Sequence, residues 1–139
     1  MIARSLLAGA LVLAALAGCG PAPGLDAGTP TAAYVQHLAP DQVDNWRGVH
    51  YDGLILDLRT AAEFDDDLGH LDNAQLVPIA DLESRLPEFD RYRGVPVMVY
   101  DRTGVNVTRA GQILVTHGFR DVSAVDGGIK GYRDWQKTR

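Results

Sequence analysis

Five short apolar runs, separated by stretches with helix start signals, most constrain the fold of this chain of 139 residues. The runs are compact and mostly apolar, as expected of strands that are covered on both faces of a sheet. They span residues 34–38, 54–58, 75–79, 97–100 and 122–125. Because these runs alternate with helical stretches, we predict one α/β domain with a roughly five-stranded, mostly parallel sheet and helices on both faces.

Two of the intervening stretches carry specific signals for helix ends. Thr60 is followed three residues later by Glu63, which is the pattern of a capping box. The helix expected to begin at Val107 is the clearest, because its apolar residues share one face. Gly118 stands where a left-handed residue is favoured at the end of that helix.

The beginning of the chain is typical of an exported lipoprotein. Residues 5–18 form an apolar run that is shorter than the roughly 20 residues needed to span a bilayer, and it matches a secretory signal. The run ends in Leu-Ala-Gly-Cys19, which resembles a bacterial lipobox. We therefore expect residues 1–18 to be a lipoprotein signal peptide and Cys19 to carry the lipid. Cleavage after Ala17 by a general signal peptidase is the alternative, and it would leave Cys19 as a loose thiol.

The segment after the lipobox separates the expected anchor from the folded domain. Residues 19–31 are rich in Gly, Pro and Ala without a periodic apolar face, which predicts a lipid anchor followed by a flexible tether. The single folded domain is then expected over residues 32–139. Gly20 follows the cysteine, which resembles sorting to the outer membrane. We expect the chain to lie in the cell envelope, held by its lipid at the periplasmic face of an outer membrane where the bacterium has one.

Charge and residue usage exclude several classes of partner. The chain has 18 acidic and 13 basic side chains and a formal net charge of −5, which argues against nucleic acid as a partner. Cys19 is the one cysteine, so a lipid on it would leave the folded domain without a thiol nucleophile. We expect no metal and no cofactor, because the histidines lack metal-ligand spacing. They are His37, His50, His70 and His117.

The segment after the fourth apolar run is the best candidate for a site. In parallel sheets, binding sites form at the carboxyl ends of the strands. The loop of residues 101–106 contains a central glycine and leads directly into the helix expected at Val107. Such a loop turns several backbone N–H groups into one concavity beside the positive end of the helix dipole. This arrangement predicts an anion cradle.

Two blocks of residues, in order, give the chain a resemblance to the rhodanese family over roughly residues 38–135. The first block has an Asp-x-Arg strand end, a Glu-Phe pair, and a Gly-His pair followed by Ala and Pro: Asp57, Arg59, Glu63, Phe64, Gly69, His70, Ala74 and Pro78. The second block has the strand and loop, a Gly-Phe pair, a Gly-Gly pair and a closing aromatic residue: 97–100, 101–106, Gly118, Phe119, Gly127, Gly128 and Trp135. The resemblance implies a rhodanese-like fold, in which a loop cysteine takes sulfane sulfur from a donor such as thiosulfate and passes it to a thiophilic acceptor.

The loop departs from the pattern of active rhodaneses, which resembles Cys-x-x-Gly-x-Arg. Asp101 stands at the nucleophile position and Asn106 at the closing Arg position, whereas Arg102, Thr103 and Gly104 are retained. A carboxylate cannot form a stable sulfur carrier, and its charge repels anionic donors. Loss of the arginine also removes a bidentate anion clamp. We therefore expect no catalytic residue in this loop. Val105 is its remaining residue.

The carboxylate of Asp101 is expected to fill the cradle itself by accepting N–H bonds from the loop. Two alternatives are that Asp101 binds a cationic ligand or metal, and that it acts as a nucleophile through an ester or acyl phosphate. We expect Asp57, Arg59 and Glu63 to be framework residues that fix the turn from strand to helix. The acidic run of residues 65–67 is expected to be a solvated surface.

These observations predict a membrane-anchored, rhodanese-like domain without sulfurtransferase activity. It would act as a binding module in the cell envelope, with an envelope protein as partner, through the surface around residues 101–106. The alternative is a rhodanese-type sulfurtransferase that uses a thiol from a partner protein or non-standard chemistry at Asp101.

Overall fold

The computed structural model describes residues 34–139, so the expected signal peptide, Cys19 and the tether lie outside the described residues. The strands are β1 (Val35–Leu38), β2 (Leu54–Asp57), β3 (Gln75–Leu76), β4 (Val97–Tyr100) and β5 (Val122–Val125). The helices are α1 (Val43–Val49), α2 (Ala61–Phe64), α3 (Leu82–Arg85), α4 (Val107–Thr116) and α5 (Gly128–Gln136), with 3-10 helices η1 (Pro40–Gln42) and η2 (Leu86–Tyr92). Among these described helices, none has the length and apolar character required to cross a membrane.

The five strands form one sheet in the order β1-β5-β4-β2-β3, and every neighbouring pair is parallel. This confirms the predicted sheet. The inner strands β2, β4 and β5 are buried along their whole length, whereas the edge strands β1 and β3 carry exposed residues. The expectation that all five strands are covered on both faces was therefore wrong for the two edges. Strand β3 is also shorter than its apolar run, although the N–H groups of Val77 and Ile79 still donate to the carbonyls of Asp57 and Leu58 at 2.8 and 3.0 Å.

Alternate residues of the inner strands face two separate hydrophobic cores. Leu56 and Val99 pack in one core together with residues of α3, η2 and α4. Ile55 and Met98 pack in the other core, together with residues of α1 and α5. Helices therefore cover both faces of the sheet, as predicted from the alternation of strands and helices.

The local helix signals are also confirmed. The N–H of Thr60 donates to the Glu63 carboxylate at 3.1 Å, and the N–H of Glu63 donates to the Thr60 hydroxyl at 3.4 Å. At the end of α4, Gly118 has a φ of +91°. The N–H groups of Gly118 and Phe119 donate to the carbonyls of Val115 and Leu114 at 3.0 and 3.1 Å. This is a Schellman motif, and it directs the chain from α4 toward β5.

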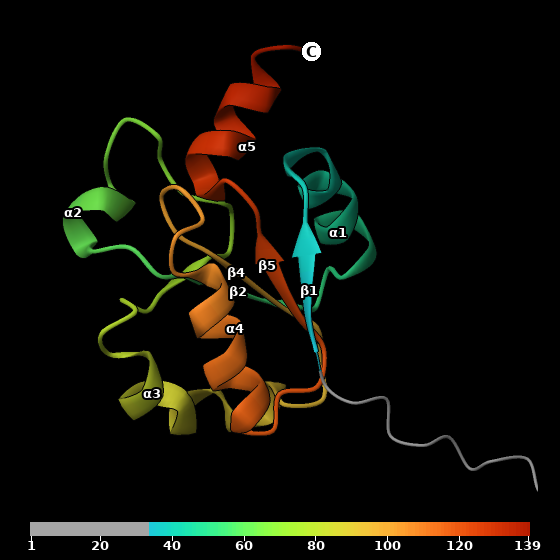
Figure 1. The fold of residues 1–139 in the computed structure, drawn as a ribbon, viewed down its shortest axis with the longest axis vertical. Coiled ribbons are helices and arrows are strands. Elements are labelled where there is room, and N and C mark those ends of the chain that lie inside the picture. The colour runs from blue at the N-terminus through green and yellow to red at the C-terminus, as the bar shows by residue number, and fades with distance from the viewer. Residues whose placement is uncertain (1–33) are drawn as a thin grey trace, which may run out of the picture.

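All strands point the same way, so their carboxyl ends lie at one end of the sheet. In Figure 1 the arrowhead of β1 points toward this end, where α5 and α2 lie, and α3 lies at the opposite end. The loops that follow β2, β3 and β4 are consequently neighbours, although they lie far apart in the sequence.

A substitution at Gly111 of α4 would test how tightly this helix packs on β1. A Cβ atom at Gly111 would lie 2.7 Å from both γ-methyl carbons of Val35, whose side chain is stiff at χ1. Alanine gains roughly 1 kcal/mol of helix propensity over glycine, but overpacking costs about 1–3 kcal/mol. We expect Gly111→Ala to lower the free energy of unfolding by about 1 kcal/mol, measured by urea unfolding followed through tryptophan fluorescence.

Gly48 of α1 supplies the matched control, because a Cβ atom there meets nothing within 4 Å. Gly48→Ala gains the helix propensity alone and should stabilise the fold. Adding Val35→Ala to Gly111→Ala should recover part of the loss, since it removes the clashing methyl groups. Equal stabilisation by the two glycine replacements would contradict the tight contact between α4 and β1.

Candidate functional site

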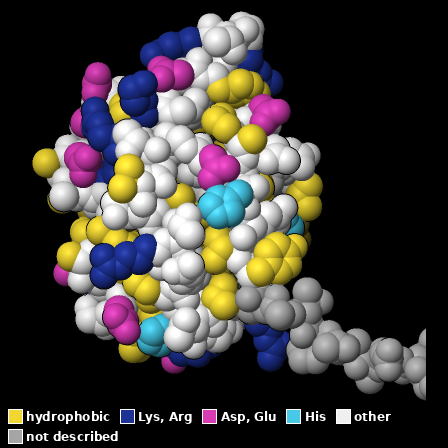
Figure 2. All heavy atoms as spheres, viewed as in Figure 1, with side chains coloured by type: hydrophobic (Ala, Val, Ile, Leu, Met, Phe, Trp, Pro, Cys, Tyr) yellow, Lys and Arg dark blue, Asp and Glu magenta, His cyan; other side chains and the backbone are white. Residues whose placement is uncertain are grey.

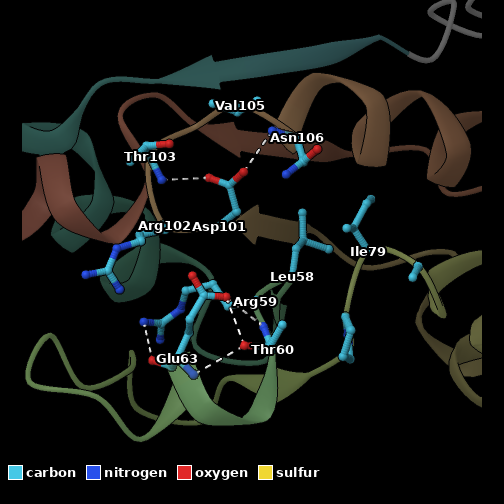
Figure 3. A pocket seen from close by; sticks show the side chains of 12 residues that line it. Leu58, Arg59, Thr60, Glu63, Ile79, Asp101, Arg102, Thr103, Val105 and Asn106 are labelled. Atoms are coloured by element: carbon cyan, nitrogen blue, oxygen red, sulfur yellow. Dashed lines mark hydrogen bonds between the residues drawn. The ribbon is translucent and has the colours of Figure 1, made fainter.

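A pocket of about 370 Å³ lies at the carboxyl ends of β2, β3 and β4. Its walls come from residues 58–60 after β2, residues 78–80 after β3 and the loop of residues 101–106 after β4, with Glu63 of α2 at one side (Figure 3). Strand-end pockets of this kind are the usual place for ligands in parallel sheets. The sequence placed the candidate loop at this edge, and the structure shows that two further segments complete the pocket.

The side chain of Asp101 fills the concavity of its own loop. Asp101 is 5% exposed, and its Oδ1 accepts the N–H of Thr103 at 3.0 Å and the N–H of Gly104. Its Oδ2 accepts the N–H of Asn106 at 2.7 Å (Figure 3). The carboxylate therefore accepts three N–H bonds from its own loop, as expected. Because these donors are satisfied, the cradle already contains an anion.

The backbone of the loop packs directly against the beginning of α5. The carbonyls of Asp101 and Arg102 accept the N–H groups of Ile129 and Lys130 at 2.9 and 3.0 Å. A Cβ atom at Gly128 would lie only 2.5 Å from the Asp101 carbonyl oxygen, so this approach requires glycine. The carbonyls of the loop are thus held by α5 while its N–H groups bind the carboxylate. The geometry of the loop is fixed from both sides.

A buried ion pair organises the neighbouring wall. Arg59 Nη2 lies 2.7 Å from Asp57 Oδ2, and both side chains are at most 1% exposed. The same guanidinium donates to the carbonyls of Glu63 at 2.6 Å and Gly69 at 2.8 Å. Burial lowers the pKa of Arg59, but the hydrogen bonds and charge of Asp57 outweigh burial and raise the pKa above its ordinary value. Arg59 is therefore a charged framework residue, as expected.

Asp66 corrects one expectation. The acidic run was expected to be a solvated surface, and Asp65 and Asp67 are exposed, but the side chain of Asp66 is only 19% exposed. It accepts hydrogen bonds from Arg102, from the N–H of Leu68 at 2.9 Å and from Arg59 at 3.4 Å. Burial opposes its ionisation, but the bonds from Arg102 and Leu68 prevail and lower the Asp66 pKa. Asp66 therefore connects the loop after β4 to the framework arginine after β2.

Glu63 and the segment after β3 are parts of the site that the sequence did not identify. The Glu63 carboxylate accepts the N–H of Thr60 at 3.1 Å and its hydroxyl at 3.0 Å, and it also lines the pocket. Pro78 and Ile79 line the same pocket. The signal for both was available, because carboxyl ends of parallel strands meet at one edge and each segment follows a strand of this sheet.

The site contains few groups that could take part in catalysis. Residues 34–139 contain no cysteine, and within them no group of three His, Cys, Asp or Glu residues is placed to hold a metal ion. Both oxygens of Asp101 accept backbone N–H bonds, which oppose its use as a nucleophile. The site offers a fixed carboxylate, a second carboxylate at Glu63 and an apolar wall.

A five-stranded parallel sheet with helices on both faces and a glycine-containing loop after its central strand defines an α/β domain with a strand-end pocket. The model of the Rhodanese-like domain family matches residues 39–134, and the chain belongs to this family. Two bacterial proteins named tRNA uridine(34) hydroxylase, from Pectobacterium carotovorum and Pectobacterium atrosepticum, are 33% and 32% identical to it over 123 residues. The match covers 85% of this chain and 34% of each relative. The chain therefore spans about a third of the length of these curated relatives.

Solved structures show the same fold. The reduced CoADR-RHD protein of Bacillus anthracis superposes with a TM-score of 0.63 and 24% identity, over 76% of this chain and 18% of that chain. A rhodanese-related protein of Thermoplasma volcanium superposes with a TM-score of 0.62 and 19% identity, over 72% of this chain and 92% of that chain. At these identities the likeness extends to the fold alone, and it confirms the predicted rhodanese-like architecture.

Replacement of Asp101 should open the anion cradle. Asp101→Ala leaves three loop N–H groups without their acceptor, and we expect the free energy of unfolding to fall by about 2 kcal/mol. Phosphate should then raise the thermal midpoint of the variant above that in chloride of equal ionic strength, because an anion that binds only the folded state stabilises it. The wild-type midpoint should show no such preference.

Asp90→Ala is the matched control, since Asp90 forms an exposed ion pair with Arg93 at 2.8 Å. Exposed pairs contribute about 0–1 kcal/mol, and this variant should not respond selectively to phosphate. An Asp101→Ala variant as stable as wild type and indifferent to phosphate would contradict the role of the carboxylate in the cradle.

Proposed function

We propose that this chain is a membrane-anchored, non-catalytic rhodanese-like domain that binds a protein partner in the cell envelope through the pocket and the loop of residues 101–106. The observation that carries the proposal is the Asp101 carboxylate, which accepts three N–H bonds inside the loop's own cradle. A rigid loop beside an open pocket is suited to recognition, since its geometry requires no ordering when a partner binds.

Three features argue against sulfur transfer at this site. The described residues offer no sulfur nucleophile, because their sequence lacks cysteine. The N–H groups that would hold an anionic donor are bonded to Asp101, whose charge also repels that donor. Arg102 is bonded to Asp66 and thus to a different anion. The alternative sulfurtransferase would have to use a thiol from a partner protein or non-standard chemistry at Asp101.

The curated relatives raise the question of an RNA partner. The uridine hydroxylation in their name belongs to proteins of which the match with this chain covers only 34%. A net charge of −5 disfavours binding to the phosphate backbone. On the face seen in Figure 2, acidic side chains lie among the Lys and Arg side chains rather than beside a separate basic patch. We therefore propose a protein as the partner.

The membrane anchor is the second part of the proposal, and it is supported by the sequence around Cys19. A lipid chain adds about 0.8 kcal/mol of membrane affinity for each buried CH₂ group, and two or more chains hold a protein stably. The tether would leave the domain free at the periplasmic face of an outer membrane, where the bacterium has one, within reach of envelope proteins.

We expect the chain to partition with membranes and Cys19→Ser to move it to the soluble fraction, because serine cannot form the lipid thioether. Fractionation followed by mass spectrometry of the N-terminal peptide measures both effects. Gly20→Ala is the matched control and should stay with the membranes. A wild-type Cys19 without lipid would rule out the anchor, and so would a Cys19→Ser chain that remains membrane-bound after its signal peptide has been removed.

We expect no thiosulfate-to-cyanide sulfur transfer above a buffer control from the wild-type chain or from Cys19→Ser. The double variant Asp101→Cys with Asn106→Arg should gain a persulfide after incubation with thiosulfate, because it restores a thiolate at a helix N-terminus beside an anion clamp. The thiolate takes the outer sulfur of thiosulfate and sulfite leaves, so the mass of the variant should rise by about 32 daltons, the mass of one sulfur atom.

The double variant Asp101→Ser with Asn106→Arg is the control, since it restores the clamp without a sulfur atom and should gain no mass. Sulfur transfer by Cys19→Ser would overturn the non-catalytic assignment. An Asp101→Cys double variant that folds but stays free of persulfide would show that the rest of the site no longer supports sulfur binding.

A further inference from the structure

The pocket presents an apolar wall beside the filled cradle. Leu58 and Ile79 come from the ends of two neighbouring strands, and Val105 comes from the loop after a third (Figure 3). Pro78 and Ala80 extend this wall. Three segments that are distant in the sequence thus place aliphatic side chains around one pocket.

Val105 is unusual in this group because it is 79% exposed. Its neighbours in the loop are fixed, since Gly104 and Asn106 donate their N–H groups to Asp101. An aliphatic side chain held in water on a rigid loop, at the edge of a partly apolar pocket, gains contact when a partner covers it. This feature favours a partner with an apolar side chain.

The charges of the pocket favour a cation beside that apolar group. Arg59 and Arg102 both line the pocket, but each is paired with an acid. Arg59 pairs with Asp57, and Arg102 pairs with Asp66. Both positive charges are therefore neutralised by carboxylates next to the pocket.

The two other carboxylates of the pocket wall, Glu63 and Asp101, are not paired with Arg59 or Arg102. Glu63 is held by the N–H and hydroxyl of Thr60, and Asp101 is held by three N–H groups. Counting the lining residues with their ion-pair partners gives four carboxylates and two guanidinium groups, a formal charge of −2. The helix dipole offsets part of the charge of Asp101 only, so the pocket stays complementary to a cation.

We infer that the pocket binds a segment of the partner protein that presents a large aliphatic side chain next to a lysine or arginine. The aliphatic group enters the pocket between Ile79 and Val105, and the basic group lies near Glu63. This inference rests on the proposed function, whose partner it specifies by chemistry. An acidic segment is disfavoured, because the negative charge of the pocket repels it and the loop N–H groups already donate to Asp101.

Amide chemical shifts of the ¹⁵N-labelled full-length chain in detergent micelles test the inference with short capped peptides. The probes are Gly-Leu-Lys-Gly and two relatives in which Ala replaces Leu or Glu replaces Lys. We expect the Leu-Lys peptide to shift the amide signals of Thr60, Val105 and Asn106. The Ala-Lys peptide should bind roughly tenfold more weakly because it loses most of the apolar contact. The Leu-Glu peptide should bind roughly fivefold more weakly, as expected for an exposed charge pair.

Glu63→Gln should remove most of the preference for Lys over Glu in the peptide. Glutamine also supports a capping box with Thr60, so the variant retains the local fold. Glu83→Gln makes the same charge change at an exposed residue of α3 and should leave the preference intact. Equal binding of the Leu-Lys and Leu-Glu peptides, or shifts confined to another surface, overturns the inference.

A photo-crosslinking amino acid at position 105 in intact cells separates this inference from the proposed function. The control places the same amino acid at position 138, an exposed residue just beyond the end of α5. Protein adducts at position 105 alone, together with no peptide binding, overturn the partner chemistry and leave the binding role in place. The absence of adducts at position 105 together with no peptide binding overturns both.

Discussion

The buried ion pair between Asp57 and Arg59 is the interaction on which the strand-end face of this domain depends. It places a guanidinium at the end of β2 with almost no contact with water, so loss of one partner would leave an uncompensated charge, which typically costs about 3–5 kcal/mol. The same guanidinium binds the carbonyls of Glu63 and Gly69. One side chain therefore fixes the end of α2 and the loop that follows it.

This framework is coupled to the loop after β4 through Asp66. The carboxylate of Asp66 receives hydrogen bonds from Arg59 on one side and Arg102 on the other. The loop is also held by Asp101 from inside and by the backbone of α5 from behind. The walls after β2 and β4 consequently belong to one connected set of charged and backbone hydrogen bonds, which favours a preformed shape over one that orders on binding.

The sequence predicted those parts of the molecule that depend on local signals. The inner strands, the capping box at Thr60 and the Schellman motif at Gly118 follow from residues within a few positions of each other. The cradle of Asp101 was predictable for the same reason. The partial burial of Asp66 was not, because it depends on Arg102, which lies 36 residues further along the chain. The early end of β3 was not predictable either, because an apolar run alone does not determine how far an edge strand extends.

The charge of Asp101 changes what a loop of this shape can recognise. Converging N–H groups at a helix N-terminus favour an anion, and in this chain the anion is covalently part of the loop. The interaction that would otherwise select an external anion now stabilises the fold. For the proposed binding role, selectivity would then come from groups that stay accessible in the pocket, among them the aliphatic wall and the carboxylate of Glu63. With an aspartate at position 101, the loop thus holds an anion of its own and leaves a surface suited to apolar and cationic groups.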